Sequence, residues 1–145
     1  MTPEQLRLGK ERLRLATALQ FCLPGCPSVY YGDEAGMEGG KDPFNRRTYP
    51  WGGEDRALLA HFRALGKLRK ETEALRLGDL EFICAGEGHI GFKRTWQGRT
   101  IRIYVNQNEA SWEVPGGKLL LGHNLRNVAP EWIKLSHMGW CILED

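Results

Sequence analysis

The chain has 145 residues, of which 41% are hydrophobic, so it can bury one ordinary globular core or two small ones. Its 20 Lys and Arg residues against 18 Asp and Glu residues give a net charge of +2 without a long basic block, which argues against a nucleic-acid partner. No apolar stretch approaches the roughly 20 residues of a membrane-spanning helix, and the polar N-terminus lacks a signal-peptide pattern. We therefore expect no membrane partner and a cytoplasmic location.

A helix is predicted over residues 1–21. Thr2 can cap its first turn, Pro3 suits the first helical position, and Gln5 can complete a capping box. Apolar residues recur at helical spacing until Pro24-Gly25 breaks the pattern. The β-branched and aromatic run over residues 27–31 then predicts a short buried strand.

Residues 32–52 predict a long irregular loop, because they contain five glycines and no sustained period. Long loops inside compact domains are commonly functional. The side chains around this loop mix aromatic rings, carboxylates and guanidinium groups, which suits sugar binding, although composition alone favours solvated charges and a local packing cluster. These side chains are Tyr30, Tyr31, Asp33, Glu34, Glu38, Asp42, Arg46, Arg47, Tyr49 and Trp51.

A second amphipathic helix is predicted from about Gly53 to Thr72, with Lys67 and Arg69 away from its apolar face. After residue 78 the hydrophobic period changes from helical to twofold, which indicates an all-β unit. Turn signals, including one at residues 122–124, divide this unit into six or seven strands of a small antiparallel sandwich or barrel. The final strand is expected over residues 138–143. The predicted fold class is α+β, with one domain over residues 1–76 and another over 79–145.

No residue of the chain is assigned a catalytic role. Asp33 and Glu34 are adjacent, so in an extended backbone they point apart and cannot converge on one glycosidic bond. The four histidines are scattered, and the glycine run at residues 36–40 lacks the Lys and Ser or Thr of a phosphate loop. The four cysteines form no CxxC pair, so we expect reduced, partly buried thiols and neither a metal ion nor a cofactor.

The segment over residues 23–40, LPGCPSVYYGDEAGMEGG, resembles the last barrel strand of glycoside hydrolase family 13, the alpha-amylase superfamily. Its continuation KDPFNRR, followed by Tyr49-Pro50-Trp51, resembles the cyclomaltodextrinase, neopullulanase and maltogenic amylase branch, whose members cut α-1,4 glucosidic links in cyclodextrins, pullulan and starch. The resemblance implies that residues 1–76 are the helix, strand, loop and helix that end a (β/α)8 barrel. It also implies that residues 79–145 are the small antiparallel β-sandwich that follows the barrel.

The resemblance carries over to four residues of the loop. Asp42 and Arg46 match the D-P-x-x-R pair that holds a sugar in the donor subsites of the intact enzyme. Gly32 and Glu34 match structural positions, with Gly32 supplying backbone freedom at the strand end and Glu34 ordering the loop. The family's three catalytic carboxylates follow the fourth, fifth and seventh barrel strands, and the Asn-His-Asp motif of the seventh strand is absent from this sequence.

The leading prediction is a C-terminal fragment of a retaining α-glucan hydrolase, inactive alone, whose intact parent binds an α-glucan oligosaccharide. Without the other barrel strands, residues 1–75 are expected to pack as a helical lid, to disorder in part, or to self-associate through the exposed barrel remnant. The alternative is a non-catalytic carbohydrate-binding or interaction module. In that alternative the stacking platforms would be Trp96, Trp112, Trp132 and Trp140.

Overall fold

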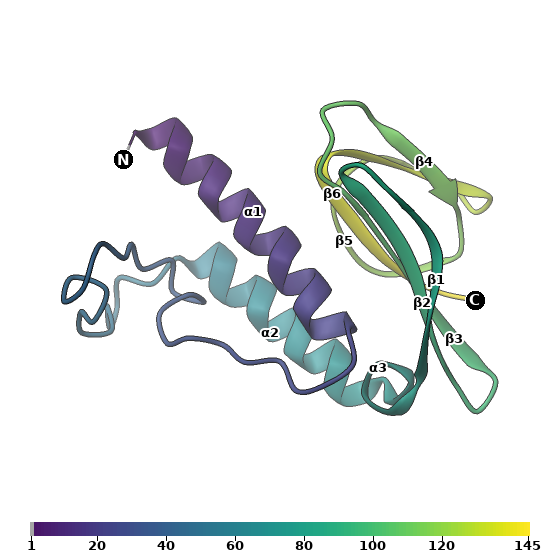
Figure 1. Ribbon diagram of the computed structural model, residues 1–145, viewed down its shortest axis with the longest axis horizontal. Helices are drawn as coiled ribbons and strands as arrows, with labels where there is room; N and C mark the ends of the chain where they lie inside the picture. The colour runs from purple at the N-terminus through teal and green to yellow at the C-terminus, as the bar shows by residue number, and fades with distance from the viewer. Residues whose placement is uncertain (1) are drawn as a thin grey trace.

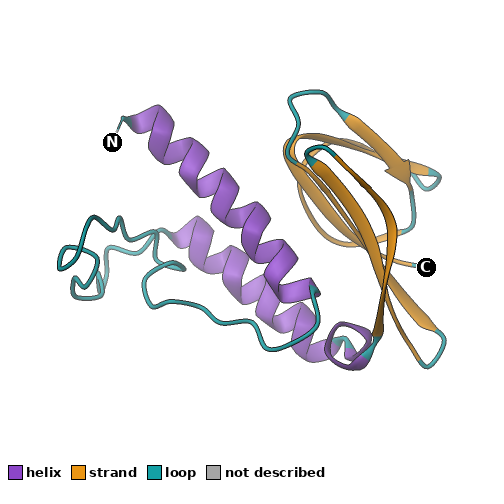
Figure 2. Ribbon diagram, viewed as in Figure 1, coloured by secondary structure: helices purple, strands orange, loops and turns teal. Residues whose placement is uncertain are grey.

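The structure is a computed structural model that describes residues 2–145. Two long helices cover one face of an antiparallel sheet, and a long loop projects from the far end of the helices (Figures 1 and 2). Within the described residues, no helix has both the length and the apolar character needed to cross a membrane. The elements are α1 (Pro3–Cys22), α2 (Arg56–Glu71), α3 (Glu73–Leu77), β1 (Asp79–Gly86), β2 (His89–Trp96), β3 (Arg99–Asn106), β4 (Trp112–Pro115), β5 (Lys118–Val128) and β6 (Trp132–Glu144).

The predicted capping box starts α1. The Thr2 side chain accepts a hydrogen bond from the Gln5 backbone N–H at 3.2 Å, and the Gln5 side chain accepts one from the Thr2 backbone N–H at 2.9 Å. At the start of α2, the Asp55 carboxylate accepts hydrogen bonds from the Ala57 and Leu58 N–H groups, each at 3.0 Å. Both predicted helices are therefore confirmed, with their first N–H groups satisfied by side chains.

The helices α1 and α2 run side by side in the same direction (Figure 1). Lys10 contacts Asp55 at 2.6 Å, Thr17 contacts His61 at 2.8 Å, and Phe21 packs edge-on against Phe62, so contacts advance together along both helices. A parallel pair requires the chain to cross back between the end of one helix and the start of the next. Residues 23–55 make that return.

The strand predicted over residues 27–31 is wrong in this structure. Residues 26–30 belong to no strand, and residues 31–36 form turns. Val29, Tyr30 and Tyr31 are 41%, 55% and 44% exposed, so the segment has neither ladder partners nor the burial that favours a strand among the described residues.

The sheet has six antiparallel strands in the order β1-β2-β3-β6-β4, with β5 also paired to β6. The turn predicted at residues 122–124 is wrong, because these residues lie inside β5. Asn124 and Met138 adopt positive φ angles of 51° and 55°, and the pairing of β5 with β6 is irregular around Asn124. The strand predicted over residues 138–143 begins earlier, at Trp132, and runs through the irregular position at Met138.

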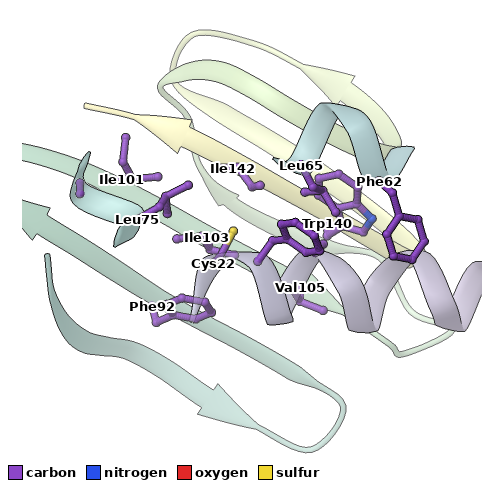
Figure 3. Close-up of a cluster of buried hydrophobic side chains, with 13 residues drawn as sticks. Cys22, Phe62, Leu65, Leu75, Phe92, Ile101, Ile103, Val105, Trp140 and Ile142 are labelled. Atoms are coloured by element: carbon purple, nitrogen blue, oxygen red, sulfur yellow. The ribbon is translucent and has the colours of Figure 1, made fainter. Parts of the chain in front are cut away.

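Side chains alternate across β3 and β6 and build a core on each face of the sheet. Ile103 and Ile142 face the helices (Figure 3), where they share one cluster with residues of α1, α2 and α3. Tyr104 and Leu143 face the opposite way and pack with Ile133 in a second cluster. The sheet therefore forms the predicted sandwich-like unit, and the helices share its first core in this structure. The division into domains at residues 76–79 stays a prediction.

Two buried arginines tie the end of α1 to the rest of the chain. Arg69, expected on the polar face of its helix, is only 8% exposed and donates to the carbonyl oxygens of Phe21 at 2.6 Å, Leu23 at 3.2 Å, and Gly25. Arg94 is 1% exposed and donates to the carbonyl oxygen of Cys22 at 2.6 Å and to that of Gly78, the residue before β1. The last carbonyls of a helix lack intrahelical donors and carry partial negative charge, so guanidinium groups suit this position.

A polar network joins α1 and α2 to the sheet. Glu11 of α1 accepts hydrogen bonds from His123 at 2.7 Å and Asn124 at 2.8 Å. His61 of α2 pairs with Thr17, and its ring lies edge-on to the ring of Trp140, with 5.6 Å between centroids. The interface between helices and sheet therefore contains groups that titrate.

The stability of the chain is expected to fall as pH falls from about 6.5 to about 4. Burial, and then the positive charges of Arg14 and His123, lower the pKa of His61 to about 4, whereas the unfolded chain has the ordinary value of 6.5. In this window the unfolded chain binds a proton that the folded chain does not, so stability present above pH 6.5 is lost on acidification. Because the ring is partly exposed, we expect a loss of roughly 1–2 kcal/mol between pH 7 and pH 4.

Urea unfolding at a series of pH values measures this loss. The matched control is His61→Gln, which keeps a polar side chain beside Thr17 but does not titrate, and its profile should be flatter than the wild-type profile over pH 4–6.5. Identical profiles for the two proteins would contradict the assignment to His61.

Candidate functional site

The candidate site is the loop over residues 23–55, which runs back along the helices from the end of α1 and projects past the start of α2, away from the sheet (Figure 1). Two contacts fix it to α1. Lys10 Nζ lies 2.6 Å from the Asp55 carboxylate, and Gln20 donates to the Ser28 carbonyl oxygen at 2.7 Å. Between the two ends of the loop, the Asp55 backbone N–H donates to the carbonyl oxygen of buried Ala35 at 2.9 Å. Within the loop, the Tyr31 hydroxyl donates to the Arg47 carbonyl oxygen at 2.9 Å. The irregular conformation predicted for residues 32–52 is confirmed.

Asp42 and Arg46, the two predicted sugar contacts, lie together in this loop. Arg46 Nε is 2.9 Å from Asp42 Oδ1, and the two side chains are 71% and 64% exposed. A turn brings them together, because the Arg46 N–H donates to the Pro43 carbonyl oxygen at 3.0 Å. An ion pair this exposed contributes about 0–1 kcal/mol to folding, so its polar atoms are free to meet a ligand at little cost in stability.

Gly32 and Glu34 contact each other at the start of the loop. Gly32 has φ +94°, and a Cβ at this position would collide with the Met37 side chain. The Glu34 carboxylate accepts a hydrogen bond from the Gly32 N–H at 2.9 Å. Burial, and then the neighbouring Glu34 carboxylate, raise the pKa of Asp33 above its usual range. These contacts order the backbone. They do not place the Asp33 or Glu34 carboxylate across from a second carboxylate with room for a glycosidic bond between them.

The loop lines an open hollow of about 530 Å³. One wall comes from residues 35–40 and the other from residues 47–53, so the loop builds the hollow without help from the sheet. Four of the lining residues are glycines, of which Gly36 and Gly53 already donate their N–H groups to backbone carbonyl oxygens, and Glu38, Arg47 and Thr48 add polar side chains. The sequence predicted a polar loop but not this hollow. Its two walls come together only because the backbone turns between them, and the sequence pattern does not give the geometry of those turns.

The tryptophans of the sheet are not exposed platforms. Trp140 is 3% exposed within the core shared with the helices (Figure 3). Trp96 packs against that same core, Trp112 packs against the second one, and Trp132 is half-buried. The exposed tryptophan is Trp51 of the loop, at 85%. Its accessibility could not be predicted, because residues 49–51 are uniformly bulky and apolar and carry no periodic signal.

The described residues hold no group of three or more His, Cys, Asp or Glu side chains placed to bind a metal ion. All four cysteines are free thiols. Burial raises the pKa of both Cys22 and Cys141 to about 12, so neither forms a thiolate at neutral pH.

No family model matches the chain. An amylopullulanase from Thermoanaerobacter thermohydrosulfuricus is 51% identical over 87 residues, which is 60% of this chain and 6% of that enzyme. A cyclomaltodextrinase from Geobacillus thermopakistaniensis is 35% identical over 108 residues, or 72% of this chain and 18% of that enzyme. The crystal structure of a debranching enzyme from Nostoc punctiforme matches 93% of this chain and 31% of its own, with a TM-score of 0.79 and 29% identity.

These similarities, together with a helical layer on an antiparallel sheet, place the chain among the glycoside hydrolases. The chain belongs to glycoside hydrolase family 13, the alpha-amylase superfamily, and its match is consistent with a C-terminal part of such enzymes. It spans only 6% and 18% of the two enzymes that it matches by sequence.

Proposed function

We propose that the chain is the C-terminal fragment of a retaining α-glucan hydrolase of the cyclodextrin, pullulan or starch type. In this proposal Asp42 and Arg46 hold a glucosyl unit in the intact enzyme, and the fragment alone is inactive. The observation that carries the proposal is the exposed Asp42–Arg46 pair, at 2.9 Å, on a loop that also lines an open hollow. A carboxylate and a guanidinium side by side can accept from and donate to neighbouring sugar hydroxyls with charge-assisted hydrogen bonds.

The arrangement of the helices supports an origin in a (β/α)8 barrel. In such a barrel, successive helices run parallel and each is followed by a strand that runs back between them. Here α1 and α2 are parallel, and the loop that follows α1 runs back toward the start of α2 (Figure 1). The exposure of Val29, Tyr30 and Tyr31 is what a barrel strand would have without its neighbours. Residues 1–76 are thus the proposed barrel remnant, and 79–145 the domain that follows it.

Catalysis by the parent requires two carboxyl groups that flank the glycosidic bond, about 5–5.5 Å apart in a retaining enzyme. In the loop, Asp42 is engaged by Arg46, Glu34 by the Gly32 N–H, and Asp33 is partly buried beside Glu34. None of these carboxylates forms such a pair across an open position. The proposal therefore assigns catalysis to upstream residues of the parent.

The 145-residue chain is expected to release no reducing sugar from β-cyclodextrin, pullulan or soluble starch above the level of a buffer control. A longer polypeptide that carries the upstream barrel should release reducing sugar from at least one of them in the same assay. Hydrolysis by the short chain would overturn the assignment of catalysis upstream. Failure of the long polypeptide on all three substrates would overturn the proposed activity.

A further inference from the structure

Trp51 is the most exposed large hydrophobic side chain of the described residues, at 85%. Its ring lies beside that of Tyr49, with 4.7 Å between centroids and 52° between planes. Partial burial, and then the Glu34 and Glu54 carboxylates, raise the pKa of Tyr49. The Tyr49 ring is half-buried, whereas the Trp51 ring presents its surface to solvent.

The backbone around Trp51 is fixed by short-range hydrogen bonds. The Trp51 N–H donates to the Tyr49 carbonyl oxygen at 2.9 Å, and the residue 53 N–H donates to the Pro50 carbonyl oxygen at 2.8 Å. Gly52 has φ +79° and donates its N–H to the Glu54 carboxylate at 3.2 Å. The indole is thus carried on an ordered turn, which lowers the entropy lost when a ligand stacks on it.

The aromatic pair is joined in sequence to the hollow of the loop. Pro50 lies between Tyr49 and Trp51 and itself lines the hollow, whose volume is about 530 Å³. The hollow offers the backbone of Gly39 and Gly40 together with the polar side chains of Glu38, Arg47 and Thr48. An exposed ring face one residue along the chain from a concave polar surface suits a ligand with one apolar face and a rim of hydroxyl groups.

We propose that Trp51 and Tyr49, together with the adjoining hollow, form a binding site for one pyranose ring of an α-glucan, and that this chain forms the site by itself. The choice of an α-glucan rests on the proposed function, whereas the preference for a ring with an apolar face rests on the Trp51 geometry. The indole stacks on the apolar face of the ring, and Arg47 and the backbone of residues 36–40 meet its hydroxyls. The site differs from the Asp42–Arg46 pair, which contains no aromatic surface.

Maltoheptaose titrated into the isotopically labelled chain tests this site by NMR. The indole N–H signal of Trp51, assigned by its loss in Trp51→Phe, should shift with an apparent Kd on the order of 1 mM, as expected for a single stacked ring. Backbone amides of residues 36–40 should shift with the same Kd. Sorbitol, which has hydroxyls but no ring, should leave both sets of signals unchanged at equal concentration.

Variants separate stacking from other contacts. Trp51→Ala should weaken binding at least about tenfold, as read from the amides of residues 36–40, while Trp51→Phe should keep most of it because a ring remains. Phe82→Ala removes an aromatic side chain that is 58% exposed on β1, away from the loop, and should not change the Kd. Because Trp51 is almost fully exposed, its replacement should leave the fold intact, which the unchanged signals of the sheet would verify.

Three results would overturn the proposal. The first is the absence of any shift at about 20 mM maltoheptaose, which is 20-fold the expected Kd. The second is an equal response to sorbitol, and the third is unchanged binding by Trp51→Ala. None of them bears on hydrolysis by the longer polypeptide, which depends on upstream residues. Conversely, a longer polypeptide without activity would leave a shift of the Trp51 signal in place, so the two proposals fail separately.

Discussion

Replacing Arg69 by Met is expected to lower the free energy of unfolding by about 3 kcal/mol or more. The guanidinium is 8% exposed and donates to three carbonyl oxygens, those of Phe21, Leu23 and Gly25. Methionine fills much of the same volume but leaves these acceptors in the interior without donors. A buried acceptor left without a donor costs roughly 1–3 kcal/mol, and a domain of this size is stable by only about 5–15 kcal/mol.

Urea unfolding followed by circular dichroism measures this effect at neutral pH. Arg69→Lys keeps the charge but not the planar fork of donors, so its loss of stability should lie between those of Met and wild type. The matched control is Lys67→Met on the same helix, whose side chain is 75% exposed and whose nearest carboxylate oxygen is 4.0 Å away, and it should change stability by less than about 0.5 kcal/mol. A loss as small for Arg69→Met would show that water replaces the guanidinium at the end of α1.

The consequences of losing Arg69 should reach the loop. The three carbonyls that it binds belong to the end of α1 and to the first residues of the return segment, so the guanidinium fixes where the chain leaves the helix. Arg94 reaches the intervening Cys22 carbonyl from the sheet at 2.6 Å. In Arg69→Met, amide hydrogen exchange over residues 23–31 is therefore expected to quicken before exchange in β3 and β6 does.

Local signals in the sequence identified most elements correctly. The capping box at Thr2 and Gln5 specifies the start of α1 through bonds within four residues, which is why it can be predicted without tertiary information. The strand expected over residues 27–31 failed because a strand exists only through its partners, and its Val and Tyr residues meet none here. The turn expected at 122–124 failed because Asn124 adopts positive φ within a long bent strand instead of reversing the chain.

The candidate site was likewise only partly predictable from the sequence. The four-residue spacing of Asp42 and Arg46 places them within reach of each other, and the structure brings them to 2.9 Å. The burial of Arg69 could not be predicted, because its partners are carbonyl groups 44 to 48 residues earlier in the chain that no side-chain pattern encodes. The hollow of the loop likewise depends on two segments that meet only after the backbone turns.

Asp42→Asn and Arg46→Gln, made in a polypeptide that carries the upstream barrel, are each expected to lower kcat/KM for β-cyclodextrin by about 10- to 100-fold. In the proposed role, each change removes a charge-assisted hydrogen bond to sugar, and it also leaves its neighbour without a partner, since Arg46 Nε and Asp42 Oδ1 are 2.9 Å apart. The double variant should therefore lose much less than the product of the two single losses, because the residues act as one unit.

Lys41→Gln is the matched control, because it changes a charge on the same exposed loop outside the pair, and it should keep kcat/KM within about twofold. Thermal unfolding of all variants should stay close to that of the unaltered protein, since a pair with 71% and 64% of its side chains exposed adds little to stability. Full additivity of the two losses would mean that the residues bind separate sugars. Unchanged kinetics in both single variants would reduce the pair to a surface salt bridge and leave stacking on Trp51 as the loop's contribution to sugar binding.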